Sequence, residues 1–258
     1  TLHGNVADKK CLENVKGLEE LALFTDSIEE GKLDGIFANN KNLTRIVLTK
    51  PRRPETMHSI AKHLTKLQTL KVQSPGEQFL LRANNSPVYK LPSVTYFGIT
   101  FKEIAEVFEI GDLSFDVPHL KRLNLHGHQV HDRIINFIKH FKELEILEFF
   151  VRDYDPIQCI EQLKHIKQFT IYFSENRFES VKSIFNNFDK ESKFQTLNFV
   201  NFPESFYQKY EDTMKEFNIH LNNNMKPTWT LSHEEQIEKG QMYLTFRREP
   251  CKRDSCRR

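Results

Sequence analysis

Residues 120–125 read Leu-Lys-Arg-Leu-Asn-Leu, a hexapeptide with apolar residues at its first, fourth and sixth positions. The same spacing recurs along most of the 258-residue chain. The eight apolar triplets are Leu18/Leu21/Leu23, Leu43/Ile46/Leu48, Leu67/Leu70/Val72, Leu91/Val94/Tyr96, Leu120/Leu123/Leu125, Leu144/Leu147/Phe149, Ile166/Phe169/Ile171 and Phe194/Leu197/Phe199. Their third members are separated by 25, 24, 24, 29, 24, 22 and 28 residues, so the sequence predicts an array of structural repeats.

Strands and helices are expected to alternate along this array. The fourth and sixth residues of a triplet share one face of a strand, because side chains point alternately to the two sides. Between triplets the apolar spacing becomes helical, as in Met57, Ile60, Ala61 and Leu64. Asp155-Pro156-Ile157-Gln158 predicts another helix start, with an acidic N-cap followed by proline. Each unit can bury its apolar faces only against its neighbours, so the strands should stack into a parallel sheet.

The triplets and their spacing resemble the leucine-rich-repeat family over residues 1–221. The helical segments between them are most similar to the repeats of F-box/leucine-rich-repeat proteins. This resemblance implies an α/β solenoid, or horseshoe, with parallel strands on the concave face and helices on the convex face. It also implies a non-enzymatic role in protein binding, in which the repeats hold the substrate of an SCF-type ubiquitin ligase and a Skp-type adaptor joins them to the cullin.

The sequence departs from the family in the position three residues after each triplet, where the resemblance implies Asn or Cys. Those positions hold Asp26, Pro51, Pro75, Ile99, His128, Arg152, Ser174 and Phe202. We therefore expect looser and more variable turns after the strands. Residues 1–5 parallel residues 124–128, so we also expect the sequence to begin inside a repeat whose first part lies upstream. The F-box that the resemblance implies has no candidate within residues 1–258.

The repeat period weakens after residue 221, which predicts an array over 1–221, a C-terminal cap over 222–246 and a disordered basic tail over 247–258. Trp229 and Tyr243 are expected to cover the last repeat. The tail has six Lys or Arg residues and two acids, a charge of +4, so the chain's net charge of +2 leaves −2 for residues 1–246. Nuclear localisation or contact with an anionic surface is the alternative for the tail. Residues 233–236 are interpreted as a polar helix.

Composition bounds the location and the partners. The mean hydropathy is −0.56 and no apolar segment has the length that a membrane span needs. The chain has only four cysteines, which favours a reducing compartment and hence the cytoplasm, with the nucleus as an alternative. Nucleic acid is disfavoured as a partner, because the basic excess lies in the tail and not over a folded face.

Catalytic and metal-binding motifs are weak. The sequence has no phosphate-binding Gly-rich loop, no Gly-x-Ser-x-Gly and no His-Glu-x-x-His, so neither catalysis nor a cofactor is expected. His126-Gly127-His128-x-x-His131 could ligate a metal, but nothing in the spacing makes the three rings converge. Cys251 and Cys256 lack the second pair of ligands that a zinc site needs. We predict no metal site.

The residues predicted to bind a partner are on the sheet face opposite the leucines. The positions directly after each triplet are Phe24, Thr49, Gln73, Phe97, His126, Phe150, Tyr172 and Val200. We predict an exposed stripe of Phe97, His126, Phe150 and Tyr172, flanked by Arg122, Asn124 and Glu148. Aromatic side chains with a nearby Arg are typical of protein interfaces. The alternative is that the aromatic side chains fold over the strand edges into the core.

Three roles compete for such a chain. The first is the substrate-recognition domain of an F-box-like ubiquitin ligase subunit. The second is a structural or regulatory scaffold that uses its basic tail and convex face. The third is an extracellular recognition domain, for which Asn42-Leu43-Thr44 and Asn84-Asn85-Ser86 offer glycosylation sequons. An F-box or a signal peptide in an upstream sequence would decide among them.

Overall fold

The computed structural model describes residues 14–28, 31–80, 88–101, 113–127, 134–151, 163, 165–172, 195–200, 229–236 and 241–248. The chain forms two compact units, Thr1–Leu144 and Glu145–Arg258. Both units contain parallel strands, and helices accompany the strands in the first unit, so the predicted α/β class with a mostly parallel sheet is confirmed.

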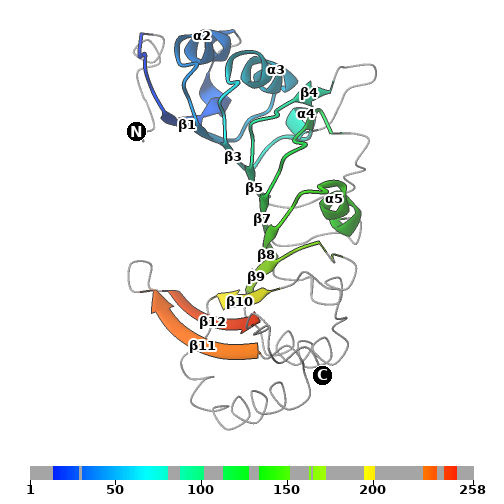
Figure 1. The fold of residues 1–258 in the computed structure, drawn as a ribbon. Coiled ribbons are helices and arrows are strands. Elements are labelled where there is room, and N and C mark those ends of the chain that lie inside the picture. Colours follow the sequence, from blue (N-terminus) through cyan, green and yellow to red (C-terminus); the bar gives the residue numbers. More distant parts are fainter. Residues whose placement is uncertain are drawn as a thin grey trace. The chain divides into compact units, whose positions relative to one another are not determined.

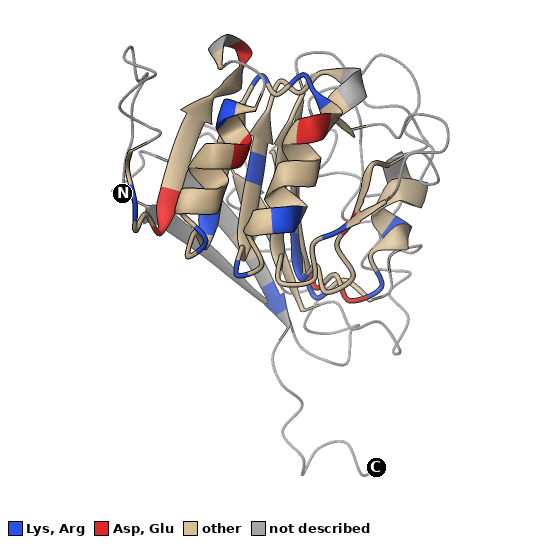
Figure 2. Cartoon of the chain, turned by 90° about the horizontal axis from the view of Figure 1, so that it is seen from above, with Lys and Arg blue, Asp and Glu red and all other residues tan. Residues whose placement is uncertain are grey.

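The first unit contains a parallel sheet with helices against one of its faces (Figure 1). Its strands, in spatial order, are β1 (Glu20–Phe24), β2 (Arg45–Thr49), β3 (Thr69–Gln73), β5 (Tyr96–Thr100) and β7 (Arg122–Gly127). Its helices are η1 (Thr25–Ser27), α2 (Lys32–Asn39), α3 (Pro54–His63), α4 (Glu77–Leu80) and α5 (Ile134–His140). The short strands β4 (Tyr89–Lys90) and β6 (Phe115–Asp116) pair separately. Figure 2 shows α2 and α3 side by side over the sheet.

Successive strands are entered through the same backbone hydrogen bonds. One carbonyl accepts bonds from two consecutive N–H groups at the start of the next strand, over distances between 2.8 and 3.2 Å in the first unit. The accepting carbonyls in this unit belong to Glu19, Thr44, Gln68 and Thr95. Glu145 and Lys167 do the same in the second unit. The same pattern of backbone hydrogen bonds therefore recurs at the starts of these described strands.

The triplet leucines form the core beneath this sheet. In β1, β2, β3 and β7 the fourth and sixth triplet residues are at most 3% exposed. Ile36 and Phe37 of α2 and Met57 and Ile60 of α3 are buried against them. Complete burial of such a side chain contributes about 1.5–3 kcal/mol, so this apolar layer between the sheet and the helices is a main source of the unit's stability.

Strand β5 differs from the prediction in its register. Phe97 pairs with Leu70 of β3, and Ile99 pairs with Val72, so these two residues are the ones that enter the core. Phe97 is fully buried and Ile99 is 2% exposed, whereas Tyr96 is half-buried on the opposite face. The predicted triplet Leu91/Val94/Tyr96 is therefore wrong, and Val94/Phe97/Ile99 takes its place.

The error has a physical cause in the turn before the strand. The Leu91 carbonyl accepts a hydrogen bond of 3.2 Å from the Val94 N–H, which closes a tight turn. Leu64 and Val117 close the same turn in the neighbouring repeats. An apolar residue thus precedes each of these triplets by three positions, and in this repeat the sequence alone permits two alignments.

The turns that follow β2 and β3 are alike. Lys50 and Ser74 both have a positive φ, of 55° and 48°. The N–H of each donates to the last carbonyl of the next strand over 2.7 Å, Lys50 to Gln73 and Ser74 to Thr100. The expectation of loose, variable turns is therefore wrong at these two places, where backbone bonds join neighbouring repeats.

The second unit also contains parallel strands. They are β8 (Ile146–Val151), β9 (Gln168–Tyr172) and β10 (Thr196–Val200). The long strands β12 (Gln241–Arg248) and β11 (Trp229–Gln236) form an antiparallel hairpin, and β12 pairs with β10 (Figure 1).

This hairpin corrects two predictions about the C-terminal part. Residues 233–236 are not a polar helix but the end of β11, because their backbone bonds come from β12. Arg247 and Arg248 belong to β12 and not to the tail. The expected helix at Asp155 and the rest of the tail lie outside the described residues.

Within the part of the chain that the structure describes, no helix has the length and apolar composition needed to cross a membrane.

Candidate functional site

The first unit has a sheet face that is opposite the helices, here called the helix-distal face (Figure 1). The strand register arranges its side chains in three rows. The entry row is Glu20, Arg45, Thr69, Tyr96 and Arg122. The middle row is Ala22, Val47, Lys71, Gly98 and Asn124, and the exit row is Phe24, Thr49, Gln73, Thr100 and His126.

On this face, two cationic side chains lie beside the ring of Tyr96. Lys71 Nζ is 5.1 Å from the centroid of its ring, and Arg122 Cζ is 5.2 Å from the same centroid. Both cations are within the range of cation–π attraction, which contributes about 0.5–1 kcal/mol at exposed sites. Three adjacent strands, β3, β5 and β7, thus place two cations around one aromatic ring.

Gly98 is the reason that the ring can lie close to the sheet. A Cβ atom at Gly98 would be 3.3 Å from Tyr96 Cε1, 3.5 Å from Tyr96 Oη and 3.3 Å from Lys71 Cγ. The ring and the lysine stem therefore occupy the space where a larger side chain would stand. We name Lys71, Tyr96, Gly98 and Arg122 the tyrosine platform.

The exit row is joined by short polar bonds near β2 and β3. Thr49 Oγ1 donates to Gln73 Oε1 over 3.0 Å, and Thr25 Oγ1 donates to the Thr49 carbonyl over 3.0 Å. Phe24 at the end of β1 is 36% exposed, with Lys50 Nζ 5.2 Å from its ring centroid. A second aromatic side chain with an adjacent cation is thus accessible on this edge.

The predicted binding residues are divided between the two units. Arg122, Asn124 and His126 lie on the helix-distal face of β7, one in each row. The prediction for Phe97 is wrong: its side chain is fully buried, with its ring centroid 5.3 Å from that of Phe115, and Thr100 takes its place beside His126.

In the second unit, Phe150 of β8 and Tyr172 of β9 are half-buried neighbours whose ring centroids are 4.8 Å apart. Glu148 is only 9% exposed, so its predicted exposure is wrong. It begins a row of polar residues in which Thr170 and Thr245 are also buried. Asn198 donates to Thr170 Oγ1 over 3.2 Å and accepts from Thr245 Oγ1 over 3.0 Å, which gives this row a structural role.

Sequence reasoning missed Lys71, Tyr96 and Gly98. The misaligned fourth triplet assigned Tyr96 to the core, and nothing local indicates that Lys71 and Arg122, 51 positions apart, face the same ring. The apolar residue three positions before several of the triplets, such as Leu64 and Val117, was the signal that could have corrected the alignment.

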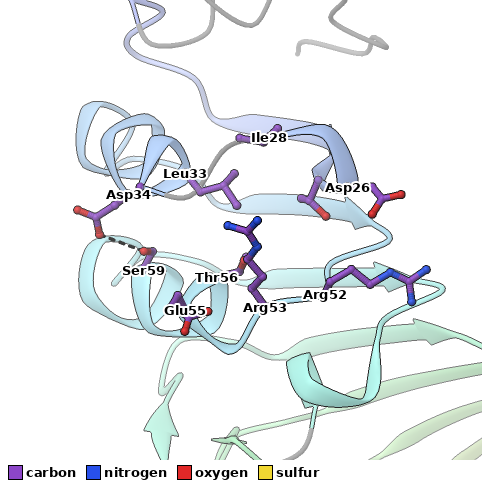
Figure 3. A pocket seen from close by; sticks show the side chains of 11 residues that line it. Asp26, Ile28, Leu33, Asp34, Arg52, Arg53, Glu55, Thr56 and Ser59 are labelled. Carbon is purple, nitrogen blue, oxygen red and sulfur yellow. Dashed lines mark hydrogen bonds between the residues drawn. The ribbon is translucent and has the colours of Figure 1, made fainter.

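A cavity of about 250 Å³ lies at the carboxyl ends of β1 and β2 (Figure 3). Its walls include Asp26, Asp34, Glu55, Arg52 and Arg53, so both signs of charge line it. Figure 3 shows Arg53 directed from the start of α3 toward Leu33, and Asp34 turned toward Ser59. Because the charges nearly balance, the cavity does not favour an anion or a cation.

Asp34 next to this cavity joins two helices. Its Oδ1 accepts hydrogen bonds from Ser59 Oγ over 3.0 Å and bonds His63 Nε2 over 2.9 Å, while Lys62 Nζ is 3.3 Å from Oδ2. Ser59 and His63 bond the same oxygen, which is a clamp between α2 and α3 and not the serine–histidine contact that nucleophilic catalysis requires.

Burial raises the pKa of Asp34, but the hydrogen bonds from Ser59, His63 and Lys62 and the charge of His63 outweigh it, so the pKa lies below its ordinary value. A carboxyl whose pKa is lower in the folded state stabilises the fold above its unfolded pKa, and this stabilisation is lost as the pH falls through the folded value.

We therefore expect the Asp34→Asn variant to be less stable than the wild type at neutral pH, by less than about 1 kcal/mol because the carboxylate is 39% exposed. The difference should shrink as the pH falls below about 4. Urea unfolding followed by circular dichroism at a series of pH values measures it. A difference that stays constant down to strongly acidic pH would contradict the assignment.

Among the described residues, no group of three or more His, Cys, Asp or Glu side chains could hold a metal ion. His128, His131, Cys251 and Cys256 lie outside those residues. No protein-family model matches the chain, and no curated protein matches it in sequence. The inferred function therefore depends on the surfaces themselves.

Proposed function

We propose that this chain is a leucine-rich-repeat solenoid that binds a protein partner through the helix-distal face and catalyses no reaction itself. The tyrosine platform carries this proposal. An aromatic ring beside an Arg, held between β3 and β7 on a sheet face, has the composition of the anchors that dominate protein interfaces.

The recurring pattern of backbone hydrogen bonds supports the solenoid part of the proposal. In stacked repeats of 22 to 28 residues, each strand contributes one side chain to each row, and neighbouring side chains in a row are about 4.8 Å apart. A partner that spans several strands can therefore bind side chains that are far apart in the sequence. The cavity near Asp34 is a weaker candidate, because its polar groups are used to join α2 to α3.

The test compares the proteins that co-purify with the Tyr96→Ala and Tyr89→Ala variants when the full-length protein is expressed in its native cell type. Both tyrosines are half-buried, but Tyr89 of β4 packs on His58 of α3, with ring centroids 5.3 Å apart. An anchor residue contributes at least about 2 kcal/mol, so Tyr96→Ala should lower the affinity for co-purifying proteins about 30-fold. Tyr89→Ala should retain them. Equal recovery with both variants would place the interface elsewhere.

We extend the proposal to the substrate-recognition role of F-box/leucine-rich-repeat proteins, which the repeat length and the intervening helices support. This part predicts that the full-length protein co-purifies with a Skp-type adaptor in the cytoplasm or nucleus. Tyr96→Ala should leave the adaptor bound while it releases the substrate. Isolation of the full-length protein without any such adaptor would refute the ligase role and leave the protein-binding role standing.

A further inference from the structure

We propose that the helix-distal face binds an acidic, extended segment of its protein partner, with carboxylates on either side of Tyr96. This inference rests on the proposed protein-binding function and names the chemistry of the partner.

Charge complementarity is the first argument. Among the residues that the three rows comprise, Arg45, Lys71 and Arg122 are cations and Glu20 is the acid. Glu20 is the register neighbour of Arg45, at the β1 edge of the sheet, and offsets its charge. Two of the three cations, Lys71 and Arg122, belong to the tyrosine platform, whereas the helices on the opposite side carry both signs of charge (Figure 2).

The spacing of the two cations is the second argument. Lys71 Nζ and Arg122 Cζ each lie within 5.2 Å of the Tyr96 centroid, so they are at most about 10 Å apart. Side chains two positions apart in an extended peptide project to the same side and are separated by about 7 Å. Two acidic residues at this spacing can reach both cations while the peptide lies over the ring.

Preorganisation is the third argument. The lysine and arginine side chains are held beside the ring, and Gly98 lets the ring lie against the sheet. Side chains that are ordered before binding lose less conformational entropy when the partner arrives. An Arg guanidinium also binds a carboxylate through two parallel hydrogen bonds, and Arg122 is exposed at the surface.

A nucleic acid is a poorer match for the same face. Proteins that bind it commonly neutralise about six to ten phosphates, and their basic residues form a stripe over the folded surface. The three cations of this face, one of them next to Glu20, suit a short acidic peptide better.

The experiment measures the fluorescence anisotropy of labelled peptides of about ten residues with the purified chain. The probe alternates Glu and Ser, and two matched peptides alternate Gln with Ser and Lys with Ser. We expect the Glu peptide to bind at least about tenfold more tightly than either control, and its affinity to fall at high salt because the contacts are exposed. Equal binding of the Glu and Gln peptides would overturn the proposal.

Variants then locate the site. The double variant Lys71→Gln/Arg122→Gln should lower the affinity for the Glu peptide at least about tenfold. The matched control, Lys66→Gln/Arg52→Gln, removes one exposed Lys and one exposed Arg from outside the face and should change it less than about twofold. Gly98→Val, which keeps both cations but displaces the ring, should weaken binding as well. Circular dichroism checks that each variant is folded. An equal loss in the control pair would overturn the proposal.

Two further outcomes separate this inference from the function on which it rests. If a single-stranded oligonucleotide binds more tightly than the Glu peptide, through the same two cations, the ligand of this face is a nucleic acid and the acidic-peptide proposal is overturned. If Tyr96→Ala releases the co-purifying proteins but the Glu peptide does not bind, the acidic chemistry is wrong and the protein-binding function stands. If Tyr96→Ala releases nothing, the protein-binding function through this face is wrong.

Discussion

Replacing Phe97 by alanine is expected to lower the free energy of unfolding by about 3–5 kcal/mol, because its ring is fully buried under β5, against Phe115. The loss combines the transfer of the ring from the core with a cavity beside Phe115, its edge-to-face neighbour. Urea unfolding of the purified chain, followed by far-ultraviolet circular dichroism, measures the difference.

Tyr96→Ala is the matched control one position earlier. It removes a half-buried ring and its two cation contacts, so it should cost only about 1–2 kcal/mol. The pair distinguishes the two alignments of the fourth repeat. If Tyr96→Ala were the more damaging change and Phe97→Ala the milder one, Tyr96 and not Phe97 would be the core residue, and the tyrosine platform would not exist.

Asn40→Ala is the second large effect, with an expected loss of about 2–4 kcal/mol. Asn40 is 1% exposed and its side chain makes three hydrogen bonds to backbone groups. It accepts from the Leu18 N–H over 3.0 Å and donates to the Val15 and Ile36 carbonyls, both over 2.9 Å. Alanine removes all three bonds; the bond to Ile36 is buried and the other two are partly buried, and an unpaired buried group costs about 1–3 kcal/mol.

Asn42→Ala provides the control for this prediction, because Asn42 is exposed and accepts one bond from Lys66. It should change the stability by less than about 0.5 kcal/mol. Asn40→Asp should resemble Asn40→Ala, since a carboxylate cannot donate to the Val15 and Ile36 carbonyls. Chemical denaturation of the three variants checks the order, and a stable Asn40→Ala would mean that this side chain does not hold the segment before β1.

Asn40 also shows where a repeat pattern stops being informative. It occupies the turn position that Leu64, Leu91 and Phe141 occupy in other repeats, and like them it closes a turn through its carbonyl. In the sequence, a polar residue at this position is only an exception to the apolar pattern. The structure gives the reason for Asn40, because its side chain bonds backbone groups of the adjacent segment 15–18.

The candidate site was predictable only in part. Arg122, Asn124 and His126 were correctly assigned to the face opposite the leucines, because alternation along a strand is a local property. Phe97 and Glu148 were assigned wrongly to an exposed position. The register of β5 is set by its pairing with β3 and β7. Glu148 is buried in a row of polar residues that come from several strands, and local sequence does not show which residues these are.

Local sequence was enough to predict parallel strands with intervening helices. Apolar residues recur every two positions in a half-buried strand and about every 3.6 positions in a helix, and both spacings can be read over a short segment. The tertiary structure alone decided which of two alignments β5 takes, that residues 233–236 pair in a hairpin, and that Lys71, Gly98 and Arg122 meet at Tyr96. The physical reason is the same in each case. Apolar spacing reports which side of an element is buried, whereas hydrogen-bonded register decides which side chains from distant repeats become neighbours.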